Sequence, residues 1–176
     1  MDVIFHRFLE NMLAEAKEVA QSSDVVRLRP MPADPPVTYL CEFRVPHLWR
    51  RPSGLVELSH QPVLGTIHFP EDYLRSTDSH LYMKVASVLT PNFVHPNVYG
   101  SVVCLGSAFA PGTRLSWLLR EFYEIVSYSN YSLDERNSLN PEACRLLRAH
   151  GHLLESLKPE PFLRRKRNLQ IAVRAV

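Results

Sequence analysis

The residues most suited to chemistry in this chain lie in one short segment, FVHPNVYGSVVCLG, at positions 93–106. Its candidate site residues are His95, Pro96, Asn97, Gly100 and Cys104. A cysteine thiolate is a strong nucleophile that forms thioesters, and an amide side chain can donate a hydrogen bond to a developing oxyanion. The segment therefore has two interpretations: a pair of turns beside a small core residue, or a thiol held next to an amide.

A comparison of the three cysteines favours Cys104 as the reactive one. Cys41 falls in a run of alternating apolar residues and is expected to be buried in a strand. The chain has no CxxC pair, and three cysteines cannot all pair, so free thiols in a reducing compartment are expected rather than a disulfide framework. Among Cys41, Cys104 and Cys144, only Cys104 lies in a segment without helical or strand periodicity.

Other chemistry of cysteine and histidine is less well supported. A cysteine hydrolase needs an imidazole oriented beside the sulfur, but His95 precedes a rigid proline and is expected to brace the loop instead. His150 and His152 do not have the closely spaced Cys and His partners of a structural zinc site. With only six glycines, the chain has no Gly-rich phosphate loop. Neither a metal nor a cofactor is expected.

The elements that must position this segment begin with a helix and a series of strands. Apolar residues at helical spacing from Phe5 to Ala20 predict an amphipathic N-terminal helix, which ends at Ser22 and Ser23. Runs of strand-like composition follow, and the predicted strands are Val25–Leu28, Thr38–Val45, Val63–Phe69 and Leu81–Ala86. The motif WRRPSG predicts a turn between the second and third of them. Since no helix is predicted between the strands, a four-stranded antiparallel meander is favoured.

The second half of the chain combines a long irregular segment with helices. Residues 87–112 show no clear period, and a loop of this length inside a compact domain is usually functional. Thr113 is expected to cap a helix over 115–126. Asn140 and the proline after it are a favourable start for a further helix over 141–154, which a glycine weakens near its end. The expected fold class is α+β.

The composition indicates one globular domain with a basic C-terminal tail. The 176 residues are 45% hydrophobic and carry a net charge of +2. The last segment, 158–176, has six basic residues against one acidic residue, a net charge of +5, so the preceding domain, 1–157, is net −3. No apolar run approaches the ~18 residues that span a bilayer, so a cytoplasmic protein without membrane association is expected. The tail suits an acidic partner; nucleic acid is not the expected one, because the domain has no basic face with interleaved aromatic residues.

Four motifs, in this order along the chain, resemble those of the ubiquitin-conjugating enzymes, the E2 family. FPEDY at 69–73 is similar to the family's proline-containing strand end and turn. HPNVYGSVVCL at 95–105 resembles the active-site signature. AFAPG at 108–112 is similar to the loop that leads into the next helix, and SLNPEA at 138–143 resembles the start of the helix after that. With the N-terminal helix and the strand meander, the resemblance covers residues 1–155.

The resemblance implies a fold and a set of roles. The fold would be UBC-like, with an N-terminal helix, a four-stranded meander, a long active-site loop and C-terminal helices. Cys104 would accept a ubiquitin-like protein from an E1-like enzyme as a thioester and pass it to a lysine amine of a target protein. Asn97 would support the transfer, either through its amide donor or by holding the loop. His95, Pro96 and Gly100 would shape the backbone around it.

Departures from the family's pattern indicate a divergent member. Asn97 and Cys104 are one residue closer together than is usual, which requires a tighter loop, and Phe109 stands where a tryptophan is common. Leu74 and Arg75 stand where the family often has an apolar ligase-docking residue, so use of an E3 ligase is left open.

A further position in the resemblance is the gate of the active site. In the family it is often Asp or Ser, and here it falls at Asn137, with Asp134 close by in the sequence. The alternative function is a catalytically inactive E2-fold interaction scaffold. The presence of both Cys104 and Asn97 argues against that alternative, and the altered ligase-docking surface argues for it.

Overall fold

The computed structural model describes residues 2–78, 80–106 and 110–163. The helices are α1 (Val3–Ser22), α2 (Tyr82–Val85), α3 (Leu115–Val126), the 3-10 helix η1 (Glu135–Asn137), α4 (Pro141–Ala149) and α5 (Gly151–Ser156). The strands are β1 (Val26–Pro30), β2 (Thr38–Phe43), β3 (His47–Arg50), β4 (Val56–Ser59), β5 (Val63–His68), β6 (Ala86–Val88), β7 (Val98–Tyr99) and β8 (Val102–Val103). Within the described ranges, no helix has both the length and the apolar character that crossing a membrane requires.

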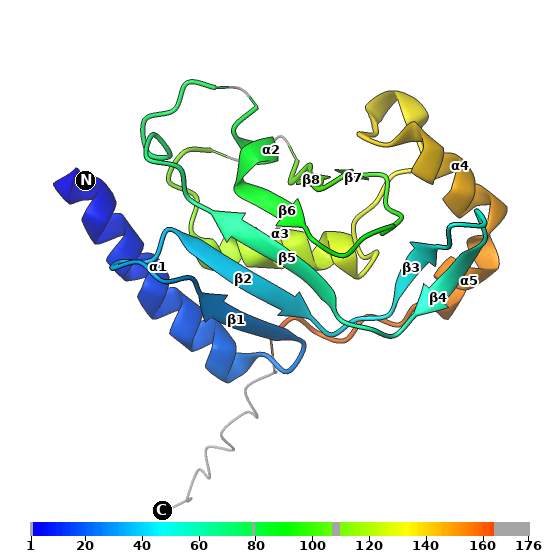
Figure 1. Ribbon diagram of the computed structural model, residues 1–176, viewed down its shortest axis with the longest axis horizontal. Helices are drawn as coiled ribbons and strands as arrows, with labels where there is room; N and C mark the ends of the chain where they lie inside the picture. Colours follow the sequence, from blue (N-terminus) through cyan, green and yellow to red (C-terminus); the bar gives the residue numbers. More distant parts are fainter. Residues whose placement is uncertain (1, 79, 107–109, 164–176) are drawn as a thin grey trace, which may run out of the picture.

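The strands form one main sheet and a separate hairpin. The main sheet has the order β1-β2-β5-β6-β8-β7, and every neighbouring pair in it is antiparallel. Strands β3 and β4 form a separate two-stranded sheet that extends from the end of the main sheet (Figure 1). Trp49 of β3 also forms an isolated bridge with Phe93. The predicted α+β class, with an N-terminal helix, an antiparallel sheet and C-terminal helices, is confirmed. The four-stranded meander accounts only for β1, β2, β5 and β6, because the hairpin is inserted after β2 and two short strands are added after β6.

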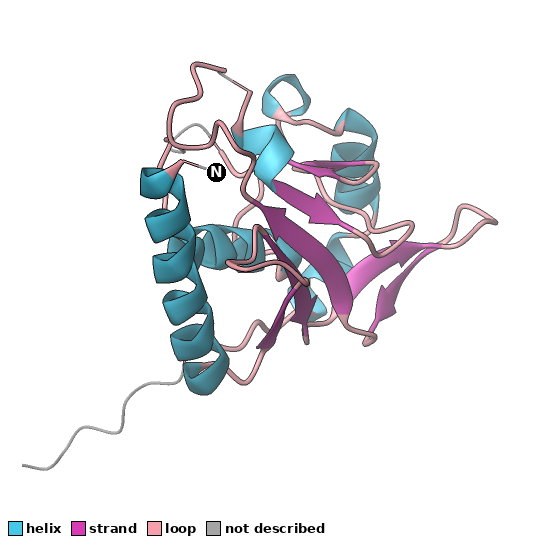
Figure 2. Cartoon of the chain, turned by 60° about the vertical axis from the view of Figure 1, so that its left-hand side comes forward, coloured by secondary structure: helices cyan, strands magenta, loops and turns pink. Residues whose placement is uncertain are grey.

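The core lies between one face of the sheet and the helices α1 and α3. Alternate residues of β2 and β5 are buried, among them Cys41, as predicted, while the residues between them are more exposed. Helix α1 lies alongside the strands (Figure 2) and packs against both β1 and α3. Phe122 of α3 lies over Gly65 of β5, where an added Cβ would be 2.5 Å from the Phe122 Cζ atom. The glycine thus allows α3 to approach the sheet closely.

The predicted strand Leu81–Ala86 is wrong over most of its length. Residues 82–85 form helix α2, and the strand β6 begins only at Ala86. Leu81 and Val85 are both buried, and their spacing of four residues suits one helical turn as well as it suits a strand. Ala86 is the first residue that pairs with β5, opposite Ile67. Sheet pairing, rather than local composition, sets the start of the strand.

Four strands were not predicted. The hairpin of β3 and β4 flanks the predicted WRRPSG turn, where the Gly54 N–H donates to the Arg51 carbonyl at 2.8 Å and Gly54 has a φ of +89°. Strands β7 and β8 lie within the segment 87–112 that shows no period. Each of them has two residues, which is too short for an alternating pattern to be detected.

The two longer C-terminal helices begin in different ways. Asn140 is the N-cap of α4, as predicted, and its Oδ1 accepts from the Ala143 N–H at 3.1 Å. The predicted cap of α3 by Thr113 is wrong: the Thr113 hydroxyl bonds to the backbone of Ala110 instead. The first turn of α3 is bound by α1, where Glu15 Oε2 accepts from the Ser116 N–H at 3.0 Å. The helix predicted over 141–154 is also interrupted, since α4 ends before His150 and α5 begins at the glycine that follows it.

The first part of the predicted basic tail lies against the domain. The Tyr123 hydroxyl of α3 donates to the Glu160 carbonyl, and the ring centroids of Tyr123 and Phe162 are 5.5 Å apart. Ser23 Oγ, after α1, donates to the Phe162 carbonyl at 2.6 Å. We call residues 159–163 the strap. The boundary at 158 stays a prediction, and residues 164–176, which carry most of the basic charge, lie outside the described residues.

Candidate functional site

Asn97 and Cys104 lie opposite each other at the open end of a tight hairpin. Strands β7 and β8 pair Val98 with Val103, and a two-residue turn of Gly100 and Ser101 joins them. The next pair outward is linked by two hydrogen bonds: the Cys104 N–H donates to the Asn97 carbonyl at 2.8 Å, and Asn97 Nδ2 donates to the Cys104 carbonyl at 3.4 Å.

The turn explains how the short spacing between Asn97 and Cys104 is accommodated. Gly100 has a φ of +59°, a left-handed value that glycine adopts at little cost, and it is the first of the two turn residues. A two-residue turn is the shortest connection common in hairpins. The amide and the thiol residue are therefore brought together by local backbone pairing.

Cys104 differs from the other cysteines in its exposure. Its side chain is half-buried, between the buried residues Val103 and Leu105, whereas Cys41 and Cys144 are fully buried. Burial raises the pKa of the Cys41 thiol strongly, so this thiol stays protonated and unreactive. Of the three cysteines, Cys104 is the one that keeps solvent-exposed surface.

His95 is enclosed in the domain. It is fully buried, and its Nδ1 accepts from the Asn97 N–H at 3.0 Å. Its ring lies against those of Phe93 and Tyr128, with centroid distances of 6.2 and 5.0 Å. Burial lowers the pKa of His95 to about 3, so the imidazole is neutral at physiological pH. Its Nε2 has no hydrogen-bond partner within the described part of the chain. This geometry orients the Asn97 backbone and does not supply a base to Cys104.

Two residues outside the segment hold it in place, and the sequence interpretation did not assign them this role. Tyr128, after α3, has a left-handed φ of 58°; its hydroxyl accepts from the Leu48 N–H at 3.2 Å and donates to the Val94 carbonyl. Asn140 donates to the carbonyls on both sides of Asn97, as described below. Asn140 was predicted as a helix cap, but its second set of contacts depends on where α4 lies. No local sequence pattern around Tyr128 indicates that it holds this segment.

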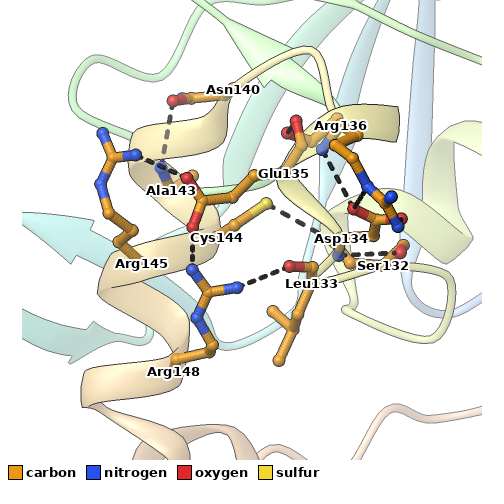
Figure 3. A network of polar contacts seen from close by, with 11 residues as sticks. Ser132, Leu133, Asp134, Glu135, Arg136, Asn140, Ala143, Cys144, Arg145 and Arg148 are labelled. Carbon is orange, nitrogen blue, oxygen red and sulfur yellow. Dashed lines mark hydrogen bonds and ion pairs between the residues drawn. The ribbon is translucent and has the colours of Figure 1, made fainter.

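Of the candidate gate residues, Asn137 is the last residue of η1, and Asp134 lies directly before η1 (Asp134 is labelled in Figure 3). Asp134 caps η1 by accepting from the Arg136 N–H at 3.1 Å, and it also accepts from Asn137 Nδ2 at 3.2 Å. Hydrogen bonds from Arg136 hold the pKa of Asp134 below its usual value. In the described residues, neither Asp134 nor Asn137 hydrogen-bonds to Asn97 or Cys104.

A cluster of charges connects η1 to α4. Glu135 pairs with Arg145, with an Nη1–Oε2 distance of 2.6 Å, and with Arg148, and both contacts are visible in Figure 3. These arginines lower the pKa of Glu135. Arg148 also donates to the Leu133 carbonyl at 2.8 Å. The exposed pairs contribute little individually, but together they connect the gate segment to the helix that Asn140 begins.

Leu74 and Arg75, two further departures from the expected pattern, follow β5 in the chain. Leu74 packs partly against the core, and Arg75 forms an ion pair with Asp2, the N-cap of α1. Phe109 lies outside the described residues. In comparisons with models of known protein families and with curated protein sequences, no match to this chain was found.

Proposed function

We propose that the chain is an E2-like conjugating enzyme that carries a ubiquitin-like protein as a thioester on Cys104 and transfers it to a lysine amine. The observation that carries the proposal is the pairing of Cys104, which is half-buried, with Asn97 across a tight hairpin, where the Asn97 amide donates to the Cys104 carbonyl. The order of elements, with a helix before an antiparallel sheet and further helices after it, is compatible with the UBC-like fold that this function implies.

The reaction proceeds by two acyl transfers. In the first, the Cys104 thiolate attacks the thioester carbonyl of the E1-bound cargo, a new C–S bond forms, and the E1 thiolate leaves. In the second, a neutral lysine amine attacks the Cys104 thioester, the C–N bond forms, and the Cys104 thiolate leaves while the amine loses its proton to solvent. Both steps pass through a tetrahedral oxyanion.

Asn97 supports the transfer in one of two ways. Its Nδ2 carries two N–H groups, and the Cys104 carbonyl accepts from one of them. The other N–H would stabilise the oxyanion of the second step. Alternatively, the amide acts only by holding the backbone of Cys104. His95, which is neutral and buried, fixes the Asn97 N–H in either case.

A charging assay tests the carrier. The chain is mixed with an E1-like enzyme, a ubiquitin-like protein and ATP, and a thiol-sensitive adduct is expected. Cys104→Ser should form a more stable oxyester, and Cys104→Ala should form no adduct. Cys41→Ala and Cys144→Ala are matched controls that should still charge. An adduct that persists in Cys104→Ala, or wild-type protein that is never charged, would exclude this function; the latter result would favour an interaction scaffold.

A second assay separates the two roles of Asn97. If its amide stabilises the oxyanion, Asn97→Ala should accept cargo normally but discharge it to free lysine about 10²–10³ times more slowly. If the amide only holds the loop, charging and discharge should fall together. Single-turnover measurements of both steps on the same preparation distinguish these outcomes, and unchanged discharge would mean that Asn97 has no part in the reaction.

A further inference from the structure

Asn140 bonds to the backbone on either side of Asn97. Its backbone N–H donates to the Pro96 carbonyl, and its side-chain Nδ2 donates to the Val98 carbonyl, each at 2.9 Å. Its Oδ1 is used by the Ala143 N–H at the start of α4. One residue therefore begins the helix and holds two of the three carbonyls around the candidate catalytic amide.

The third carbonyl, that of Asn97 itself, accepts from the Cys104 N–H. With the Asn97 N–H bonded to His95, the backbone of Asn97 has no freedom to turn while Asn140 holds its neighbours. We infer that Asn140 is a positioning residue for the reaction: it aims the Asn97 side chain at the Cys104 thioester by fixing the peptides before and after it. This inference rests on the proposed function.

Position 140 requires asparagine because the contact with the loop uses its side-chain N–H donor. Asp and Ser are as good as Asn at a helix N-cap, because the cap uses only a side-chain oxygen. The contact with the Val98 carbonyl needs an N–H donor that reaches across to the loop, which neither Asp nor Ser supplies. Asn140→Asp and Asn140→Ser should therefore keep the cap of α4 and the backbone bond to the Pro96 carbonyl, and lose only the side-chain bond to the Val98 carbonyl. Asn140→Ala should lose the cap as well.

Hydrogen exchange tests whether Asn140 restrains the loop around Asn97, and it requires no ubiquitin-like protein. In Asn140→Asp and Asn140→Ser, the Cys104 amide should exchange roughly three- to tenfold faster, which corresponds to one net hydrogen bond. The amides of β2 report on global opening and should be unchanged. Cys144→Ala is the matched control, because it removes a fully buried group from α4 without touching the loop. If the Cys104 amide exchanges at the wild-type rate in both cap-preserving variants, the inference is overturned.

Discharge kinetics test the consequence for the reaction. The Asp and Ser variants should discharge to free lysine roughly three- to tenfold more slowly, with charging less affected, and Cys144→Ala should discharge normally. Faster exchange with unchanged discharge would overturn the positioning role while leaving the carrier function of Cys104 intact. Wild-type protein that is never charged would instead overturn the proposed function, and the exchange result would then show only a structural brace.

Discussion

The first turns of α3 and α4 are stabilised in opposite ways. Helix α4 begins with its own cap, Asn140, whose oxygen accepts from the N–H three residues later. Helix α3 has no side-chain cap of its own; Glu15, 101 residues earlier in the chain, accepts from the Ser116 N–H and pairs with Arg114. Met12 Sδ accepts from the Leu115 N–H at 3.1 Å.

This difference in capping distinguishes α3, a helix of the core, from α4, the helix that supports the candidate site. The cap from α1 joins two helices of the core and helps set how they pack. The cap by Asn140 leaves its amide donor and backbone N–H free for the loop, and so connects a helix to the residues beside Cys104. The local cap at Asn140 thus also holds the loop around Asn97, whereas the cap from Glu15 joins α3 to α1. Four measurements would sharpen or break this comparison.

The largest effect is a pH dependence of the free energy of unfolding, and it comes from His95 in the loop that α4 holds. Histidine in an unfolded chain has a pKa of about 6.5, and burial lowers that of His95 to about 3. The unfolded chain therefore binds the proton first as the pH falls, so stability is complete above about pH 6.5 and is lost toward pH 3. Between pH 6.5 and 4 the loss should reach about 3 kcal/mol.

Urea unfolding at a series of pH values measures this loss. His95→Gln should flatten the dependence, although buried His47, whose pKa burial also lowers, contributes with the same sign. His152→Gln, at an exposed position, is the control and should follow the wild type. Equal slopes for His95→Gln and wild type would show that His95 is not buried as a neutral group.

The next effect concerns the distant cap. Glu15→Ala removes the acceptor of the Ser116 N–H and should lower the free energy of unfolding by about 2 kcal/mol, because a partly buried donor is left without a partner. Glu18→Ala, an exposed change on the same helix, should cost less than about 0.5 kcal/mol. Similar urea midpoints for both variants would mean that the contact between α1 and α3 adds nothing to stability.

A smaller effect is expected from the strap, the other distant segment that packs on α3. Truncation after Lys158 removes the ring contact between Phe162 and Tyr123 and should cost about 1–2 kcal/mol. Truncation after Leu163 keeps the strap and should leave the melting temperature close to that of the full chain. If both truncations melt alike, the strap does not stabilise the domain.

The smallest effect is expected at the position where the sequence suggests a local cap. Thr113→Ala should change the free energy of unfolding by less than about 0.5 kcal/mol, because among the described residues its hydroxyl bonds to the Ala110 backbone alone. Asn140→Ala, which removes a true cap, should cost about 1 kcal/mol. Thermal unfolding of the two variants under the same conditions compares them, and a larger loss for Thr113→Ala would reverse the contrast between the two helices.

Local patterns in the sequence determined a large part of this molecule. The helical spacing of apolar residues predicted α1 and α3, and alternation predicted β2 and β5 to within a residue or two at their ends. The pair Asn140 and Pro141 predicted the start of α4. The motif that holds Asn97 and Cys104 was also found from the sequence, because residue type and spacing reveal a possible thiol and amide whatever the fold.

Only the tertiary structure decided the contacts that join distant segments. The sequence placed a strand at Leu81–Ala86, but pairing with β5 is possible only from Ala86, and the preceding residues turn as α2. It assigned the cap of α3 to Thr113, although Glu15 has that role once α1 packs beside it. The double use of Asn140 and the link from Tyr128 to Val94 depend on positions in space that no local pattern encodes. Helix propensity and alternation act over a few residues, whereas the bonds from Asn140 and Tyr128 to the loop around Asn97 form only when distant segments of the chain pack together.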